Sequence, residues 1–164
     1  PPRSTLFPYT TLFRSGMAQR GGSVISHFKT GEYASPLVRA GEADLLLAFD
    51  QNEGVRNLHF LRQGGAFVVN VHDRASFENP KLTAFLNERR ISAFSLEGYR
   101  LLKEHMGGNF LFLNVLLMGA MCCAGVGAPS FDETASAVKT LSPAKFEDAN
   151  MKVLALGYEA IADR

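Results

Sequence analysis

A short glycine-rich stretch, GMAQRGGSVISH over residues 16–27, carries the side chains best suited to hold an anionic group. Gly21 and Gly22 permit backbone conformations that expose N–H groups, and such groups can form an anion-binding concavity. Arg20 adds a planar cation that suits phosphate or carboxylate, and Gln19 adds both a donor and an acceptor. The stretch fits neither the GxGxxG nor the P-loop pattern. A tight turn into the next strand, with Arg20 solvated, remains the alternative interpretation.

The other titratable and nucleophilic side chains form no catalytic set at a recognisable spacing. Ser26 lacks a nucleophile-elbow pattern, and a lone strand histidine such as His27 is more often a structural group. Three further histidines fall in separate predicted elements, without a partner at metal or triad spacing: His59, His72 and His105. We therefore expect no catalytic residues on this chain.

Cys122 and Cys123 are adjacent and lie in an apolar run, so they do not form the CxxC pattern of zinc or iron–sulfur sites. Neighbouring side chains on a helix point about 100° apart, which makes it hard for both thiols to bind one metal. We expect reduced core thiols, no metal site and a cytoplasmic protein.

The charge balance and the hydropathy pattern argue against nucleic-acid and membrane partners. The chain has 17 basic and 16 acidic residues, and its basic groups are dispersed. The most apolar stretch, 110–126, contains Asn114 and Gly119 and is shorter than the roughly 20 residues that span a membrane. We expect it to form a helix buried inside the domain.

Residues 1–15, PPRSTLFPYTTLFRS, are unlike the rest of the chain. Their prolines rule out a helix, although a short strand from Tyr9 to Phe13 is compatible with the residue types. Back-translated in frame, the whole segment resembles a common short-read sequencing adapter. We therefore predict that residues 1–15 are a non-native, adapter-derived segment, disordered or irregular, and exclude them from fold reasoning. Without Arg3 and Arg14, the charge balance becomes 15 basic against 16 acidic residues.

After the loop, strand and helix patterns alternate. Two short strands are expected within 23–38, around a Gly31-Glu32 turn. Apolar runs predict strands at 43–50, 66–71 and 91–95, the first two buried on both faces. Helices are expected at 51–61, at 81–90 after Asn79-Pro80, at 96–106, from 110, at 131–140 and from 142 to about 162. Asp50 caps the first of these helices, and Gly64-Gly65 stop it. Ser130 caps the helix at 131–140.

This order of elements predicts an α/β fold with three layers, in which a mainly parallel sheet carries helices on both faces. Sheets of this kind bind ligands at the carboxyl ends of their strands. The loop at 16–22 has no strand before it to emerge from. We therefore expect the first strand and helix of the domain to be missing from 16–164.

The phrase GMAQRGGSVISH, with SPLV, GEADLLLAFD and GGAFVVNV after it, resembles the gamma domain of 2-oxoacid:ferredoxin oxidoreductases. Within that family, the beta subunits of indolepyruvate ferredoxin oxidoreductase are most similar. The resemblance is strong over 16–70 and looser toward the C-terminus, and it identifies 16–164 as a truncated pyruvate/ketoisovalerate oxidoreductase gamma-type domain. Two features depart from the family pattern: a GxGGQG-like turn is absent, and Ser15 stands where a histidine is expected.

The resemblance implies a non-thiamine subunit that supports coenzyme A-dependent oxidative decarboxylation of aryl pyruvates and is inactive alone. Thiamine diphosphate and iron–sulfur clusters would be carried by a partner subunit, coenzyme A would be a co-substrate, and ferredoxin would accept electrons through the complex. The loop facing the partner or coenzyme A would then comprise Gln19, Arg20, Gly21 and Gly22, with Ser26 and His27 next to it.

A stand-alone Rossmann-like nucleotide-binding module is the alternative. It would be a monomer that binds nucleotide in the micromolar range, but no acidic ribose-binding residue stands at the usual spacing. A complex subunit, by contrast, should expose apolar patches when isolated, because stable complexes bury large surfaces.

Overall fold

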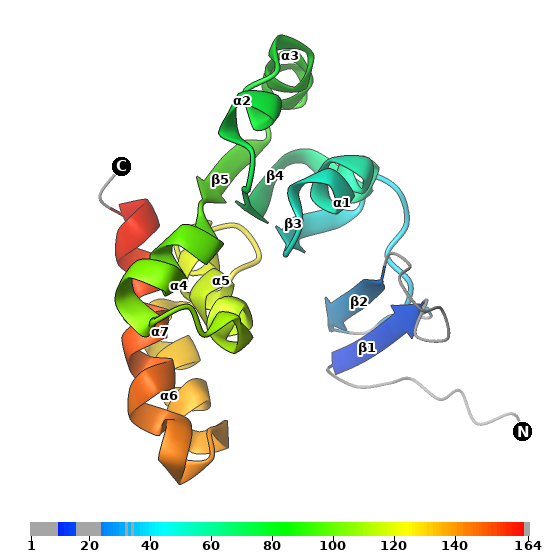
Figure 1. Cartoon of the computed structure of the whole chain (residues 1–164). Coiled ribbons are helices and arrows are strands. Elements are labelled where there is room, and N and C mark those ends of the chain that lie inside the picture. Colours follow the sequence, from blue (N-terminus) through cyan, green and yellow to red (C-terminus); the bar gives the residue numbers. More distant parts are fainter. Residues whose placement is uncertain (1–9, 16–23, 32, 34, 163–164) are drawn as a thin grey trace, which may run out of the picture.

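The computed structural model describes residues 10–15, 24–31, 33 and 35–162, with side chains described from residue 24 onward (Figure 1). The strands are β1 Thr10–Ser15, β2 Ile25–Thr30, β3 Ala43–Ala48, β4 Leu61–Asn70 and β5 Ser92–Leu96. The helices are α1 Gln51–Arg56, α2 Arg74–Phe77, α3 Pro80–Glu88, α4 Gly98–Met106, α5 Leu113–Met121, α6 Phe131–Leu141 and α7 Glu147–Ala162. Short 3-10 turns join them as η1 Leu58–Phe60, η2 Phe110–Phe112 and η3 Ala144–Phe146.

The central sheet is parallel, with strand order β3-β4-β5. Side chains of β4 alternate between two hydrophobic cores, because successive residues of a strand point to opposite faces. Ala66 and Val68 pack with the core that α4, α5 and α7 supply, whereas Phe67 and Val69 pack with the core to which η1 and α3 contribute. The apolar run of β4 is therefore buried on both faces, and the predicted three-layer α/β architecture is confirmed.

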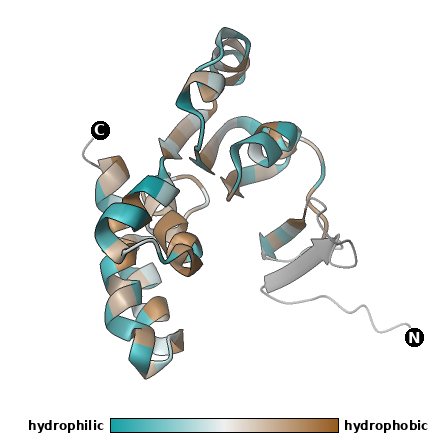
Figure 2. Ribbon diagram, in the orientation of Figure 1, coloured by the Kyte–Doolittle hydropathy of each residue, from teal (hydrophilic) through white to brown (hydrophobic). Residues whose placement is uncertain are grey.

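The two helices α5 and α7 cross at unusually close range. Gly119 of α5 lies against the backbone carbonyl of Leu154, and Gly157 of α7 lies against that of Leu116. A Cβ atom at either glycine would overlap the facing carbonyl oxygen. Figure 2 shows how the hydrophobic residues concentrate on α5 and the strands it covers, while the outer helical faces are mixed or polar.

Several helix starts form as the sequence predicts. The Asp50 side chain accepts from Asn52 N and Glu53 N, and Asn79 accepts from Lys81 N with Pro80 at the first helical position. Ser130 caps α6 in a reciprocal arrangement with Glu133. These local signals act within one turn, which is why residue type alone indicates them.

The expected helix at 51–61 is too long. It ends at Arg56, and Leu61 already begins β4, which continues through Gly64 and Gly65. Gly64 has φ +73°, and the pairing register of β3 with β4 shifts at this point, so the glycines form an irregularity within a strand. The Gly64-Gly65 pair, which was expected to end a helix, thus forms a bulge within β4.

Of the two strands expected around Gly31-Glu32, the first is confirmed as β2, whereas the second is not found. β2 pairs antiparallel with β1, and residues 35–38 form no strand. Side chains take the backbone donors of that segment instead, since Leu37 N donates to Ser35 Oγ and Val38 N donates to His27 Nδ1. The irregular structure expected for residues 1–15 is not found over Thr10–Ser15, where β1 lies close to the short strand considered at Tyr9–Phe13.

Candidate functional site

The four central residues of the predicted loop, Gln19, Arg20, Gly21 and Gly22, lie outside the described residues. Ser26 and His27 are described, and both belong to β2. Exposure alternates along this strand, so Ser26 lies on the exposed face with Phe28, which is 60% exposed, whereas His27 is half-buried on the other face. Adjacent strand residues cannot face one ligand together, and the structure therefore separates this predicted pair.

His27 faces the sheet-bearing part of the chain. Its Nδ1 accepts a hydrogen bond of 3.2 Å from Val38 N, and its ring meets Phe60 edge-on with 5.3 Å between ring centroids. Burial, and then the nearby positive charge of Lys29, lower the pKa of His27. Because Nδ1 is an acceptor here, the neutral ring carries its proton on Nε2.

The carboxyl ends of β3, β4 and β5 meet at one edge of the sheet, and Asn70 ties them together there. This side chain is fully buried at the end of β4. Its Nδ2 donates to Phe49 O at 3.0 Å, and its Oδ1 accepts from Gly98 N at 2.9 Å. One amide thus links the segment after β3 to the first residue of α4.

Gln51 performs a similar task one residue after the Asp50 cap. It is buried, and its Oε1 accepts from His72 N at 3.0 Å and from Asp73 N at 2.9 Å. The turn after β4 is therefore held by a side chain from α1. The only sequence signal for either amide was its position, at the end of an apolar strand for Asn70 and directly after a capping aspartate for Gln51.

Glu97 at this edge is paired with two arginines. Glu97 receives Arg74 Nε at 2.9 Å and Arg100 Nε at 2.6 Å, one on each carboxylate oxygen. The hydrogen bonds from Arg74 and then Arg100 hold the pKa of Glu97 below its ordinary value. His72 Nδ1 lies 3.8 Å from Asp50 Oδ2. At this edge, the side chains of Asn70, Gln51 and Glu97 thus bind backbone groups or arginines of the same chain.

The two cysteines do not form a binding site. Cys122 Sγ donates to Met118 O at 3.2 Å, and Cys123 Sγ donates to Tyr158 O at 3.5 Å. Burial, and then the neighbouring Cys122, raise the pKa of the Cys123 thiol. Within the part of the chain that the structure describes, no group of three or more His, Cys, Asp or Glu side chains could hold a metal.

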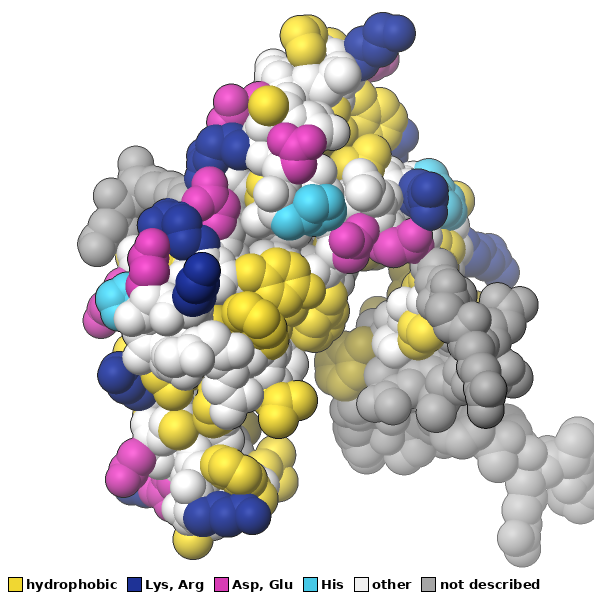
Figure 3. Space-filling model, in the orientation of Figure 1, with side chains coloured by type: hydrophobic (Ala, Val, Ile, Leu, Met, Phe, Trp, Pro, Cys, Tyr) yellow, Lys and Arg dark blue, Asp and Glu magenta, His cyan; other side chains and the backbone are white. Residues whose placement is uncertain are grey.

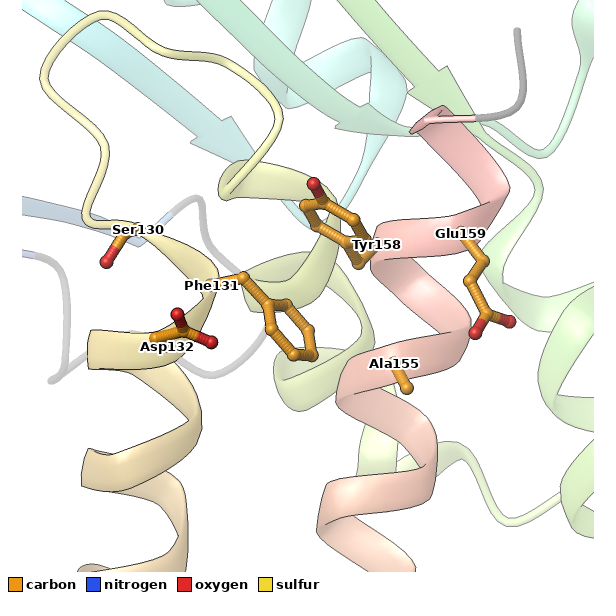
Figure 4. A pocket seen from close by; sticks show the side chains of 6 residues that line it. All are labelled: Ser130, Phe131, Asp132, Ala155, Tyr158 and Glu159. Carbon is orange, nitrogen blue, oxygen red and sulfur yellow. The ribbon is translucent and has the colours of Figure 1, made fainter.

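A groove of about 470 Å³ lies between α6 and α7 (Figure 4). Its walls include Phe131 and Tyr158, whose ring centroids are 4.8 Å apart, and the carboxylates of Asp132 and Glu159 stand at its margin. No sequence pattern indicated it. Among the described helices, none has both the length and the apolar character needed to cross a bilayer.

The fold defines a class of protein before any function is assigned. A solved gamma subunit of a keto/oxoacid ferredoxin oxidoreductase from Geobacter sulfurreducens PCA superposes with a TM-score of 0.67 at 21% identity, covering 94% of this chain and 81% of that one. At this identity the likeness shows the fold alone: a three-layer α/β domain of the gamma-subunit kind.

Sequence comparison then identifies the family. The family model described as pyruvate ferredoxin/flavodoxin oxidoreductase matches residues 6–160, and the chain belongs to this family. A protein named indolepyruvate oxidoreductase subunit IorB from Methanothermobacter thermautotrophicus is 29% identical over 157 residues, covering 90% of this chain and 80% of that protein. Its namesake from Thermococcus kodakarensis is 31% identical over 160 residues, covering 88% and 77%.

Proposed function

We propose that this chain is a non-thiamine subunit of an indolepyruvate-type 2-oxoacid:ferredoxin oxidoreductase. The observation that carries the proposal is the family match over residues 6–160, together with relatives that bear the name of an indolepyruvate oxidoreductase subunit. In this role the chain supports the coenzyme A-dependent oxidative decarboxylation of aryl pyruvates. It does so as part of a complex and is inactive alone.

The side chains of this chain fit a supporting role. The polar side chains at the sheet edge, Asn70 and Gln51, form hydrogen bonds with backbone groups, and Glu97 pairs with two arginines. The two half-buried, adjacent thiols do not supply the four thiolate ligands of an iron–sulfur cluster. We therefore assign thiamine diphosphate and the clusters to a partner subunit, with ferredoxin reached through the complex and coenzyme A as co-substrate.

The exposed apolar side chains support obligate association. Tyr99 of α4 and Phe110 of η2 are 43% and 50% exposed and meet edge-on, with 5.2 Å between ring centroids. Leu111 beside them is 87% exposed. Figure 3 shows hydrophobic side chains gathered on this face of the molecule, next to a region of mixed charge. Water-exposed aromatic and leucine groups in one patch are typical of a surface that another protein covers.

The stand-alone nucleotide-binding alternative receives less support. In such modules, free backbone N–H groups at a helix start after a parallel strand bind the phosphates. At the start of α4, which follows the parallel strand β5, the N–H of Gly98 is already bonded to the Asn70 side chain at 2.9 Å. The start of α4 is thus engaged in holding the sheet edge.

Within the proposed complex, the loop of Gln19, Arg20, Gly21 and Gly22 faces the partner or coenzyme A, and Ser26 and His27 follow it in the sequence. The test is Arg20→Ala in the chain assembled with its thiamine diphosphate-binding partner, with kcat/KM measured for indolepyruvate and for coenzyme A. We expect a loss of about tenfold or more, which corresponds to roughly 1.4 kcal/mol of transition-state stabilisation.

Arg56→Ala is the matched control, because it removes an arginine of α1 whose side chain is 73% exposed and pairs with Glu53 in the same helix. Equal activity in the Arg20 variant, the control and the wild type would favour the alternative interpretation, in which Arg20 is a solvated residue of a tight turn. Failure of the wild-type chain to assemble with any thiamine diphosphate-binding subunit would reject the subunit proposal itself.

A further inference from the structure

We infer that the groove between α6 and α7 is a docking site for an arginine side chain of a partner protein. The groove combines two aromatic rings with two carboxylates, and a guanidinium group interacts favourably with both kinds of side chain. We assign the arginine to the other subunit of the complex, and this assignment rests on the proposed function. The chemistry of the groove does not depend on it.

The rings of Phe131 and Tyr158 form the apolar part of the groove. Phe131 is the first residue of α6 and Tyr158 belongs to α7, and the two ring planes are inclined at 54°. Both residues are half-buried, so packing holds the rings while part of their surface faces the groove. Ala155 lies about one helical turn before Tyr158, and its small side chain leaves space beside the rings (Figure 4). A volume of about 470 Å³ is typical of ligand-binding pockets.

The carboxylates lie on the two sides of this aromatic surface. Asp132 belongs to α6 and Glu159 to α7, and both side chains are exposed (Figure 4). Within the described part of the chain, neither takes part in an ion pair. A basic group that enters the groove would therefore meet carboxylates that no described cation neutralises.

Helix geometry accounts for Asp132 but not for Glu159. Asp132 lies in the first turn of α6, where a negative charge interacts favourably with the helix dipole, and Glu133 beside it forms the capping box with Ser130. Glu159, by contrast, lies near the C-terminal end of α7, whose last described turn contains no basic residue. A carboxylate there is close to the negative end of the dipole. A cation supplied by another molecule would offset this unfavourable placement.

The shape of the groove favours a protein as the source of the cation. The lining residues come from the start of α6 and from the C-terminal half of α7. Two helices enclose a ligand less completely than the pockets of small molecules, which bury most of the ligand surface. An arginine on a protein surface adds contacts from its neighbours, and arginine is enriched among the residues that contribute most to protein interfaces.

The first experiment measures binding of N-acetylarginine methylamide to the full chain by NMR at constant ionic strength. The uncharged counterpart is N-acetylcitrulline methylamide. We expect the arginine compound to cause saturable shifts of the Phe131 and Tyr158 amide signals, with a dissociation constant about fivefold or more below that of the citrulline compound. Equal binding of the two compounds, or no saturable shift at these residues, would overturn the inference.

Variants of the groove distinguish docking from a general attraction between charges. Glu159→Gln should raise the dissociation constant of the arginine compound by about fivefold. Asp148→Asn, at an exposed carboxylate in the first turn of α7, is the control and should leave it unchanged. Ala155→Leu retains both carboxylates but fills the groove, and should abolish the shifts. Unchanged binding in Glu159→Gln or in Ala155→Leu would overturn the inference. If Ala155→Leu does not fold, Glu159→Gln decides the question.

The second experiment tests whether the partner subunit supplies the arginine. In the complex, Asp132→Asn combined with Glu159→Gln should raise the dissociation constant of the two subunits by about tenfold and reduce its dependence on salt. Wild-type affinity and salt dependence in this double variant would overturn the assignment to the partner subunit. Failure of the wild-type chain to assemble with any thiamine diphosphate-binding subunit would reject the proposed function, and the arginine and citrulline compounds would still decide whether the groove binds a guanidinium group.

Discussion

The side chain of Asn70 accepts a hydrogen bond of 2.9 Å from the backbone N–H of Gly98, at the point where the last strand of the sheet turns into α4. The same amide donates to Phe49 O at 3.0 Å, so its two ends serve the two neighbours of β4. A single fully buried side chain thereby determines how three strand ends align.

Asn70→Ala should be strongly destabilising, because it leaves a buried N–H and a carbonyl without their partner. Loss of such partners costs on the order of 1–3 kcal/mol for each group. The free energy of unfolding in urea measures the effect. Asn87→Ala, at an exposed position of α3, is the control and should change stability little. Equal stability of the two variants would mean that water replaces the Asn70 amide.

Gly119→Ala and Gly157→Ala should each lower the thermal midpoint, although alanine is a better helix former than glycine by about 1 kcal/mol. The overlap of the new methyl group with a facing carbonyl outweighs that gain and forces α5 and α7 apart. Ser136→Ala on the exposed face of α6 shows the effect of helix propensity without a close neighbour. A raised midpoint in either glycine variant would contradict the close crossing.

Acid should weaken the ion network around Glu97. Its pKa lies below the ordinary value in the folded chain, so its contribution is present above the unfolded pKa and is lost as the pH falls through the folded one. We expect the unfolding midpoint of the wild type to fall over this acid range more steeply than that of Glu97→Gln. Glu88→Gln, at an exposed carboxylate at the end of α3, should retain the wild-type slope. Parallel slopes in all three proteins would exclude the network as a source of acid sensitivity.

Leu111→Glu should impair assembly with the partner subunit while leaving the isolated chain folded. Leu111 is 87% exposed beside the Tyr99–Phe110 pair, so the substitution places a negative charge on an exposed apolar surface and not in the core. We expect the dissociation constant to rise by about tenfold or more. Leu141→Glu at the end of α6, where the side chain is 81% exposed, provides a comparison on another surface. Assembly that is indifferent to Leu111→Glu would place the interface elsewhere.

The origin of residues 1–15 can be settled at the level of DNA. We propose that PPRSTLFPYTTLFRS is translated adapter sequence, and sequencing of the source DNA across the codon for Gly16 should show different codons upstream. Recovery of the same fifteen codons from genomic DNA would make this segment, including β1, a native part of the protein.

Local signals accounted for much of the fold, and longer-range relations did not. Asp50, Asn79 and Ser130 act within one helical turn, so their caps could be predicted from residue type. The pairing of β2 with β1 could not, because strand partners are chosen across the chain by packing and hydrogen bonding that no single segment encodes.

The candidate site shows the same division. The separation of Ser26 from His27 could have been inferred from the two-residue period of a strand. The roles of Asn70 and Gln51 could not, since each depends on backbone groups about twenty or more positions away that only the folded sheet brings near. The prediction that Gly64 ends a helix was wrong for a related reason. A glycine indicates an unusual backbone angle, but it does not indicate whether a helix ends or a strand bulges there.

The glycine crossing of α5 and α7 has a consequence for how the protein is made. A ribosome releases α5 before α7, and the two helices cover each other's apolar surface through Leu116, Leu117, Val153 and Leu154. During translation, the apolar surfaces of α5 and of β4 beneath it therefore remain exposed to solvent. They are covered fully only after α7 has been synthesised and can pack against them. The most apolar helix of this fold is thus among the last surfaces to be covered while the chain is being synthesised.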